Sequence, residues 1–165
     1  NPANVAAARA EGLPAYHGSL LADGMDDQAR LAGIGRLIAL TSNEEANALT
    51  AVRFRREFGK DNVFQLTPKE HEPSVNRLGG EHRGLWLSQG GLSYDRLQRL
   101  YGSGAELVEV PLSDEHTLAD FVRTHGDGAV PLFIVQDGQV RVVSEATDPE
   151  RESAGTLLTF IDPRV

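Results

Sequence analysis

The chain contains no cysteine among its 165 residues. Disulfide bonds, thiol catalysis and metal sites built on cysteine are therefore excluded, and a cytosolic compartment is compatible with the composition. An excess of positive charge is also missing, because 24 acidic residues stand against 16 basic ones and give a formal net charge of -8. Phosphate backbones are bound by basic surfaces, so we expect no nucleic-acid partner.

Several motifs of known chemistry are absent too. The sequence has no G-x-G-x-x-G, no H-E-x-x-H and no nucleophile-elbow serine, and no apolar run approaches the roughly 20 residues that span a bilayer. No paired acid and base stands out, so we expect a binding protein and not an enzyme. Hydrophobic residues make up 40% of the chain, which is enough for a folded core.

The first 67 residues alternate between helical and strand patterns. The apolar run RLIALT (36–41) predicts a buried strand, the charged and alanine-rich stretch 43–58 predicts a helix ended by Gly59, and NVFQLT (62–67) predicts a second strand. Strand, helix and strand with short connections indicate a parallel sheet. Upstream, the patterns predict a helix over 1–11, a short strand over 13–17 and a helix over 20–32.

The rest of the chain has a different rhythm. Residues 68–91 predict a loop-rich segment, and residues 92–101 predict an amphipathic helix with Ser93 as its cap. The expected fold is therefore α/β, a partial Rossmann-like domain over 1–103 followed by a small α+β lobe over 104–165. In the lobe we expect a strand over 105–112, a helix over 115–126, a hairpin around Asp137-Gly138 and a last strand over 155–163.

A polar corner follows the RLIALT strand. Thr41, Ser42 and Asn43 stand between that strand and the helix over 43–58, where ligands of open parallel sheets bind beyond the carboxyl ends of strands. The corner therefore has two interpretations. It caps the helix through a side-chain oxygen, or it additionally contacts a ribose or phosphate.

The stretch from Gly18 to Gly59 resembles a known family. Gly18 comes first, then Leu31-Ala32-Gly33-Ile34, then the RLIALT strand, then Thr41, Glu44 and Asn47 in the spacing T-x-x-[DE]-x-x-N. This order is similar to the cytoplasmic nucleotide-binding domains of potassium channels, potassium uptake systems and cation:proton antiporters, the RCK or TrkA-N family. The lobe over 104–165 resembles, more loosely, the TrkA-C domain that follows in that family.

The resemblance implies a function and a site. The chain would be the cytosolic regulatory domain of a membrane cation (sodium or potassium):proton antiporter, at the cytoplasmic face of the membrane, joined to a transmembrane domain of the same polypeptide. It implies cofactor-binding positions at Gly18, Ser19, Thr41, Ser42 and Asn43. The family's first strands and Gly-rich loop are not in this chain, so we expect NAD(H) or an adenine nucleotide to bind only where that loop is present upstream, in a longer polypeptide. Two alternatives stay open: a soluble regulatory subunit of a potassium uptake system, or a fragment of a nucleotide-dependent oxidoreductase.

We also expect a homodimer. The family pairs through the helices after these strands, which predicts that one or more of Leu49, Val52, Phe54 and Trp86 is buried between chains.

Outside that surface, His71 and His82 stand beside glutamates. They match no known ligand spacing, so an incidental solvated loop is favoured over a divalent metal site.

Overall fold

The computed structural model describes residues 2–18, 33–69 and 82–162, and the chain divides into two compact units, residues 1–34 and 35–165. The first unit contains helix α1 (Pro2–Ala10), which confirms the predicted helix, and Gly12 in the turn after it has φ of 77°. The strand predicted over 13–17 is wrong. Arg9 Nε donates to the Ala15 carbonyl at 2.8 Å, so this segment bonds to the preceding helix instead of entering a sheet. The helix predicted over 20–32 lies outside the described residues.

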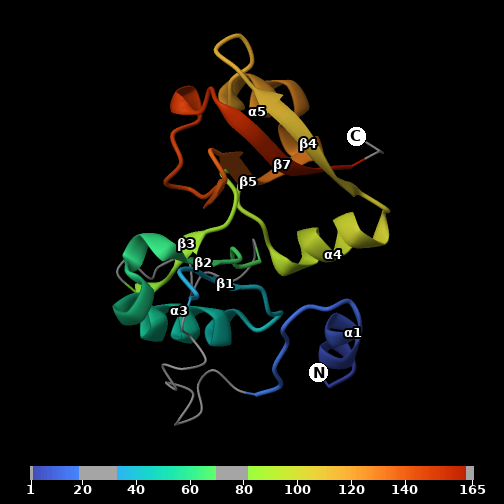
Figure 1. Cartoon of the computed structure of the whole chain (residues 1–165), viewed down its shortest axis with the longest axis vertical. Helices are drawn as coiled ribbons and strands as arrows, with labels where there is room; N and C mark the ends of the chain where they lie inside the picture. The colour runs from blue at the N-terminus through green and yellow to red at the C-terminus, as the bar shows by residue number, and fades with distance from the viewer. Residues whose placement is uncertain (1, 19–32, 70–81, 163–165) are drawn as a thin grey trace. The chain divides into compact units, whose positions relative to one another are not determined.

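The second unit begins with a parallel sheet (Figure 1). Strand β1 (Leu37–Ala39) is followed by helix α3 (Glu44–Phe58), a short 3-10 turn η1 (Lys60–Asn62) and strand β2 (Val63–Gln65). Strand β3 (Leu85–Trp86) pairs with β2, so the order in the described residues is β1-β2-β3, all parallel. The predicted strand–helix–strand unit is confirmed, whereas β3 lies in the segment predicted to be loop.

Helix α3 packs closely on this sheet because two small residues, Ala51 of the helix and Gly84 before β3, face each other. Ala51 and Phe54 are fully buried on this face, and Phe54 also stacks on Phe58 with ring centroids 5.9 Å apart. A Cβ atom built on Gly84 would lie 3.2 Å from the Ala51 Cβ and 3.0 Å from the Val63 carbonyl oxygen. Glycine at position 84 therefore sets how near the helix comes to the strands.

An antiparallel sheet makes up most of the remaining chain. Helix α4 (Tyr94–Gly102) leads to β4 (Glu106–Leu112), and helix α5 (Leu118–His125) and the 3-10 turn η3 (Gly126–Gly128) lead to β5. The strand order is β4-β7-β5-β6, and all described neighbours are antiparallel. The remaining elements are β5 (Ala129–Gln136), β6 (Gln139–Val142), the 3-10 turn η4 (Pro149–Arg151) and β7 (Gly155–Ile161).

These elements confirm the strands and helices predicted for the lobe. The hairpin turns at Asp137 and Gly138, with φ values of 52° and 74°, the conformation that favours an Asp-Gly pair. The fold is thus mixed α/β, a parallel sheet with helices and a separate antiparallel sheet.

Two hydrophobic cores hold the second unit together. The first lies between α5 and the antiparallel sheet and includes Leu118, Ile134 and Leu157. The second includes Leu66, Leu87, Leu92 and Leu100 together with Val130 and Leu132 of β5. This second core contains residues from both sides of position 103, where the sequence predicted a boundary, so the two sheets share buried apolar surface.

A row of hydrogen bonds also joins the two sheets. The Ser88 N–H donates to the Val143 carbonyl at 2.9 Å, and the Glu145 N–H donates to the Trp86 carbonyl at 3.0 Å. The Gln89 side chain donates to the Thr147 carbonyl at 2.6 Å. We call this contact between residues 86–89 and 143–147 the inter-sheet seam.

Candidate functional site

The corner after β1 is organised by its own side chains. Asn43 caps α3, with its Oδ1 accepting from the Ala46 N–H at 2.8 Å. The buried Asn47 side chain donates to the Thr41 carbonyl at 2.8 Å, and its Oδ1 accepts from the Thr41 N–H at 3.1 Å and the Thr41 hydroxyl at 2.6 Å. The capping interpretation is confirmed for Asn43. Contact with a ribose or phosphate stays a prediction.

The corner offers little to a phosphate group. Its hydroxyl and amide oxygens at Thr41 and Asn43 are used within the chain, and Glu44 and Glu45 place two carboxylates in the first turn of α3. The positive end of the helix dipole is therefore already matched by negative side chains. The described residues of the corner alone do not fit a nucleotide phosphate.

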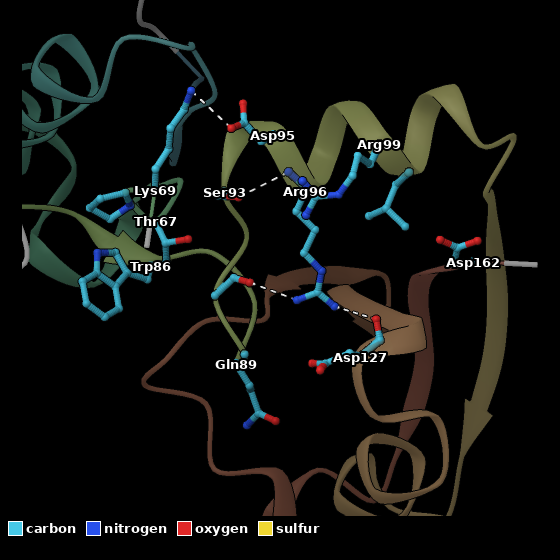
Figure 2. A pocket seen from close by; sticks show the side chains of 14 residues that line it. Thr67, Lys69, Trp86, Gln89, Ser93, Asp95, Arg96, Arg99, Asp127 and Asp162 are labelled. Carbon is cyan, nitrogen blue, oxygen red and sulfur yellow. Dashed lines mark hydrogen bonds and ion pairs between the residues drawn. The ribbon is translucent and has the colours of Figure 1, made fainter. Parts of the chain in front are cut away.

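A crevice of about 820 Å³ lies nearby, at the carboxyl ends of β2 and β3 (Figure 2). The corner and the crevice share this edge of the sheet, since the Lys69 N–H donates to Glu44 Oε1 at 2.8 Å. Open parallel sheets bind ligands at this edge, and the volume falls in the range of small-molecule pockets. The lining residues are Thr67, Pro68, Lys69, Trp86, Gln89, Gly90, Gly91, Ser93, Asp95, Arg96, Arg99, Leu100, Asp127 and Asp162.

A glycine turn after β3 shapes the floor of the crevice. Gly91 has φ of 73°, and a Cβ atom there would lie 2.8 Å from Thr67 Cγ2, so only glycine allows the turn to approach the segment after β2 this closely. Ser88, at the start of the turn, is buried and also has positive φ, 64°. Ser93 then caps α4 by accepting from the Arg96 N–H at 3.3 Å.

The basic side chains of the crevice are held to different degrees. Arg96 donates to the carbonyl oxygens of Gly91 and Asp127 at 3.3 and 2.8 Å, which fixes its guanidinium. Lys69 pairs with Asp95 at 3.2 Å, and both side chains are about half exposed. The Arg99 side chain, one turn after Arg96, makes no hydrogen bond or ion pair with the described residues. Arg99 is therefore the cation most available to a ligand.

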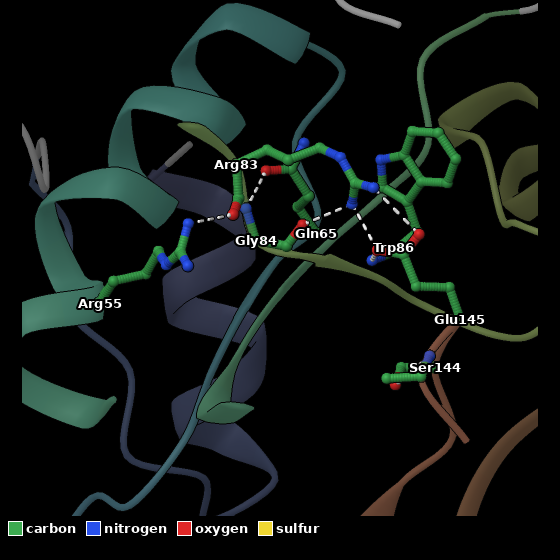
Figure 3. A network of polar contacts seen from close by, with 8 residues as sticks. Arg55, Gln65, Arg83, Gly84, Trp86, Ser144 and Glu145 are labelled. Carbon is green, nitrogen blue, oxygen red and sulfur yellow. Dashed lines mark hydrogen bonds and ion pairs between the residues drawn. The ribbon is translucent and has the colours of Figure 1, made fainter. Parts of the chain in front are cut away.

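Trp86 borders the crevice and carries a second group of contacts on its other side (Figure 3). The Arg83 guanidinium lies over its ring, 3.9 Å from the centroid. Arg83 forms a bidentate ion pair with Glu145, and Glu145 Oε1 also accepts from the Trp86 N–H at 3.1 Å. The indole Nε1 is buried and has no acceptor in the described part of the chain.

The Glu145 carboxylate keeps its charge despite partial burial. Burial raises its pKa, but the hydrogen bonds from Arg83 and the Trp86 N–H, with the positive charge of Arg83, outweigh burial and leave the pKa below its usual range. The Arg83 side chain is only 12% exposed, so the pair is more shielded from water than a surface ion pair. These contacts connect Trp86, at the border of the crevice, to Glu145 of the inter-sheet seam.

The predicted site and interface residues lie in different environments in the structure. Gly18 is exposed at a bend in the first unit, and Ser19 lies outside the described residues. Phe54, predicted as interface surface, is 1% exposed and belongs to its own chain's core, because the period of α3 turns it toward the sheet. His82 is exposed and His71 lies outside the described residues. No group of three metal-ligating side chains gathers within residues 2–18, 33–69 and 82–162.

The crevice was missed by the sequence analysis. Its signal was present, since the sequence SQGGLS places a glycine turn and a helix cap directly after an apolar pair, and Arg96 and Arg99 follow three residues apart. The two-residue strand β3 is too short to show a period, so the turn was not recognised as the end of a strand.

No model of a known protein family matches the chain, and no curated protein matches it either. Within the residues that the structure describes, no helix has the length and apolar character needed to cross a membrane.

Proposed function

We propose that this chain is the cytosolic regulatory domain of a membrane cation:proton antiporter and modulates transport through ligand binding and dimerisation. The observation that supports the proposal is the β1-β2-β3 parallel sheet, with α3 crossing between its first two strands and a capped polar corner after β1. The resemblance implies this arrangement for the later strands of a nucleotide-binding fold. A ligand shifts transport only if it binds two states of the protein with different affinity.

The exposed stripe of α3 supports the dimer. Glu45, Leu49, Val52 and Arg56 are exposed and recur at helical spacing, with Leu49 59% and Val52 41% exposed. Positions 45 and 56 are symmetric about the same midpoint as positions 49 and 52. Two copies of α3 packed antiparallel across a two-fold axis would therefore place Leu49 against Val52 and Glu45 against Arg56 of the other copy.

The charges of the stripe provide a test of the dimer. Glu45→Arg alone and Arg56→Glu alone each create like-charge pairs in this geometry and should weaken association, whereas the double variant restores opposite charges. Light scattering over a concentration series measures the mass directly. A mass of 17.9 kDa at every concentration contradicts the dimer, and single and double variants that associate equally contradict the antiparallel pairing.

Transport itself tests the regulatory role. The full polypeptide that contains this chain is expressed in cells that lack their own antiporters, and everted membrane vesicles are assayed by the dequenching of a pH-sensitive dye on addition of Na⁺ or K⁺. We expect exchange that responds to added NAD(H) or adenine nucleotide, and loss of that response when residues 35–162 are deleted. Vesicles without cation-dependent dequenching, or with a nucleotide response that survives the deletion, contradict the proposal.

A further inference from the structure

We propose that the crevice at the ends of β2 and β3 binds a small sugar phosphate, with the phosphate held by Arg99 and Lys69 and the sugar hydroxyls by Asp127. This site goes beyond the proposed function and uses none of the residues of the 41–43 corner. The crevice is lined by residues of the glycine turn and of α4, and its volume of about 820 Å³ holds a small ligand.

The cationic side of the crevice suits a phosphate monoester. Arg96 and Arg99 are three residues apart on α4, so they share one face of the helix, with Arg96 near its start and Arg99 in its last turn. Arg96 is fixed by backbone carbonyls, while Arg99 has no partner among the described residues and presents a planar fork that matches phosphate oxygens. The ion pair between Lys69 and Asp95 is exposed and therefore weak. A doubly charged phosphate can replace Asp95 as the partner of Lys69.

The opposite side of the crevice suits hydroxyl groups. Figure 2 shows Asp127 across from Lys69, with the α4 arginines between them. The Asp127 carboxylate makes no hydrogen bond or ion pair with the described residues, although its backbone carbonyl accepts from Arg96. A carboxylate repels phosphate but accepts from sugar hydroxyls, as acidic residues do for the ribose in dinucleotide sites. The two sides together select a ligand that has a phosphate at one end and hydroxyls at the other.

The aromatic lining argues against a nucleobase. Among the described residues, Trp86 is the one aromatic side chain that lines the crevice, and one face of its ring is already covered by Arg83 at 3.9 Å. Most of the other described lining residues are polar or glycine, which favours a polar ligand over a base. The buried Trp86 Nε1 has no acceptor among the described residues, which is rare in folded proteins and leaves this N–H available to a ligand.

Trp86 is also the sole tryptophan of the chain, so its fluorescence reports on the crevice directly. The whole chain is titrated at constant ionic strength with ribose 5-phosphate, inorganic phosphate, ribose and AMP. Binding of the same four compounds is also measured by calorimetry. We expect saturable binding of ribose 5-phosphate with a dissociation constant of about 1 mM or tighter. Arg99→Ala should weaken it roughly tenfold or more, with partial recovery in Arg99→Lys. Arg36→Ala, which changes an exposed arginine just before β1 and outside the crevice, is the matched control and should bind unchanged.

Each other outcome contradicts part or all of the site. Absence of saturable fluorescence change and heat with ribose 5-phosphate overturns the proposal, as does equal binding by the Arg99→Ala variant. Inorganic phosphate that binds as tightly as the sugar phosphate, or an Asp127→Asn variant that binds normally, overturns the role of Asp127. AMP that binds tenfold tighter than ribose 5-phosphate overturns the choice of a sugar phosphate over a nucleotide. None of these measurements involves transport, so the site can fail while the regulatory proposal stands.

Discussion

The parallel and antiparallel sheets of the second unit use their residues differently. The parallel strands β1, β2 and β3 have two or three residues each, and their carboxyl ends open onto the polar corner and the crevice. Antiparallel strands β4, β5 and β7 have seven or eight residues and carry a core closed by α5. Both regions contribute buried apolar residues, whereas the polar corner and most of the crevice lining lie before the antiparallel sheet. The two regions thus differ in where they expose polar groups, and both belong to one folded unit.

The substitution with the largest expected effect on the free energy of unfolding also tests whether the two sheets unfold together. Leu157 is fully buried in β7, so Leu157→Ala should lower the free energy of unfolding by about 2–5 kcal/mol. Because the second core joins the sheets, urea unfolding followed by Trp86 fluorescence and by far-UV circular dichroism should shift by the same amount. Leu107→Ala, on the same sheet but 51% exposed, is the control and should cost about 0.5 kcal/mol or less. Separate transitions for the two probes would mean that the sheets are independent.

The next effect concerns the ion pair that fastens the crevice to the seam. Glu145→Gln leaves the largely buried Arg83 without its charged partner and should cost about 1–3 kcal/mol. The wild-type pair should also be sensitive to acid. The pKa of Glu145 is lowered in the folded state, so its stabilisation is complete above the usual carboxyl value and is lost as pH falls through the folded value. Thermal unfolding between pH 3 and 7 measures both effects. Glu109→Gln on β4, at an exposed position, should change neither.

Removing a helix cap in each region should have a smaller effect on stability and allows the two regions to be compared. Asn43 caps α3 in the parallel region and Thr117 caps α5 in the antiparallel region, each by accepting a backbone N–H. Replacing either residue by alanine should cost about 1 kcal/mol. Asn43→Ala removes the side-chain cap but keeps the backbone N–H and carbonyl that contact the Thr41 hydroxyl, so the corner should keep its geometry. Urea midpoints measure the loss of the cap, and the amide NMR shifts of Thr41 and Asn47 should stay unchanged. Large shifts there would mean that the Asn43 side chain also holds the corner.

The smallest effect is a titration at the second cap. Hydrogen bonds from the Thr117 hydroxyl and N–H, with help from Arg123, lower the pKa of Asp120 to about 2. Because this folded value lies below the usual one, the capping box stabilises the fold above about pH 4 and loses that contribution as pH falls toward 2. Carboxyl NMR titration of the Asp120 resonance should give a midpoint near 2. Thr117→Ala removes the hydroxyl but keeps the N–H, so it should return the midpoint part of the way toward the usual value, and a midpoint that stays low would assign the shift to the Thr117 N–H and Arg123.

Sequence patterns predicted the elements that have a clear period and missed those that depend on distant contacts. The hairpin at Asp137-Gly138 and the helices capped by Asn43, Ser93 and Thr117 follow from local residue preferences. Strand β3 exists because Gln65 and Phe64 pair with it, and its two residues show no period of their own. The glycine turn and the Arg96–Arg99 spacing are visible in the sequence, but the complete crevice depends on distant contacts in the same way. It brings Lys69, Arg99 and Asp127 together from three segments whose proximity is set by the shared core.

The inter-sheet seam has a consequence for the exchange of backbone protons. The amide protons of Ser88 and Glu145 donate across the seam to carbonyls that belong to the other sheet region. They reach solvent only when the two regions separate, and this separation also exposes the second core. Their hydrogen–deuterium exchange should therefore occur through global unfolding and be among the slowest in the chain. A ligand in the crevice should slow the Ser88 amide further, whereas the amides on the open edge of β6 should exchange at their original rate.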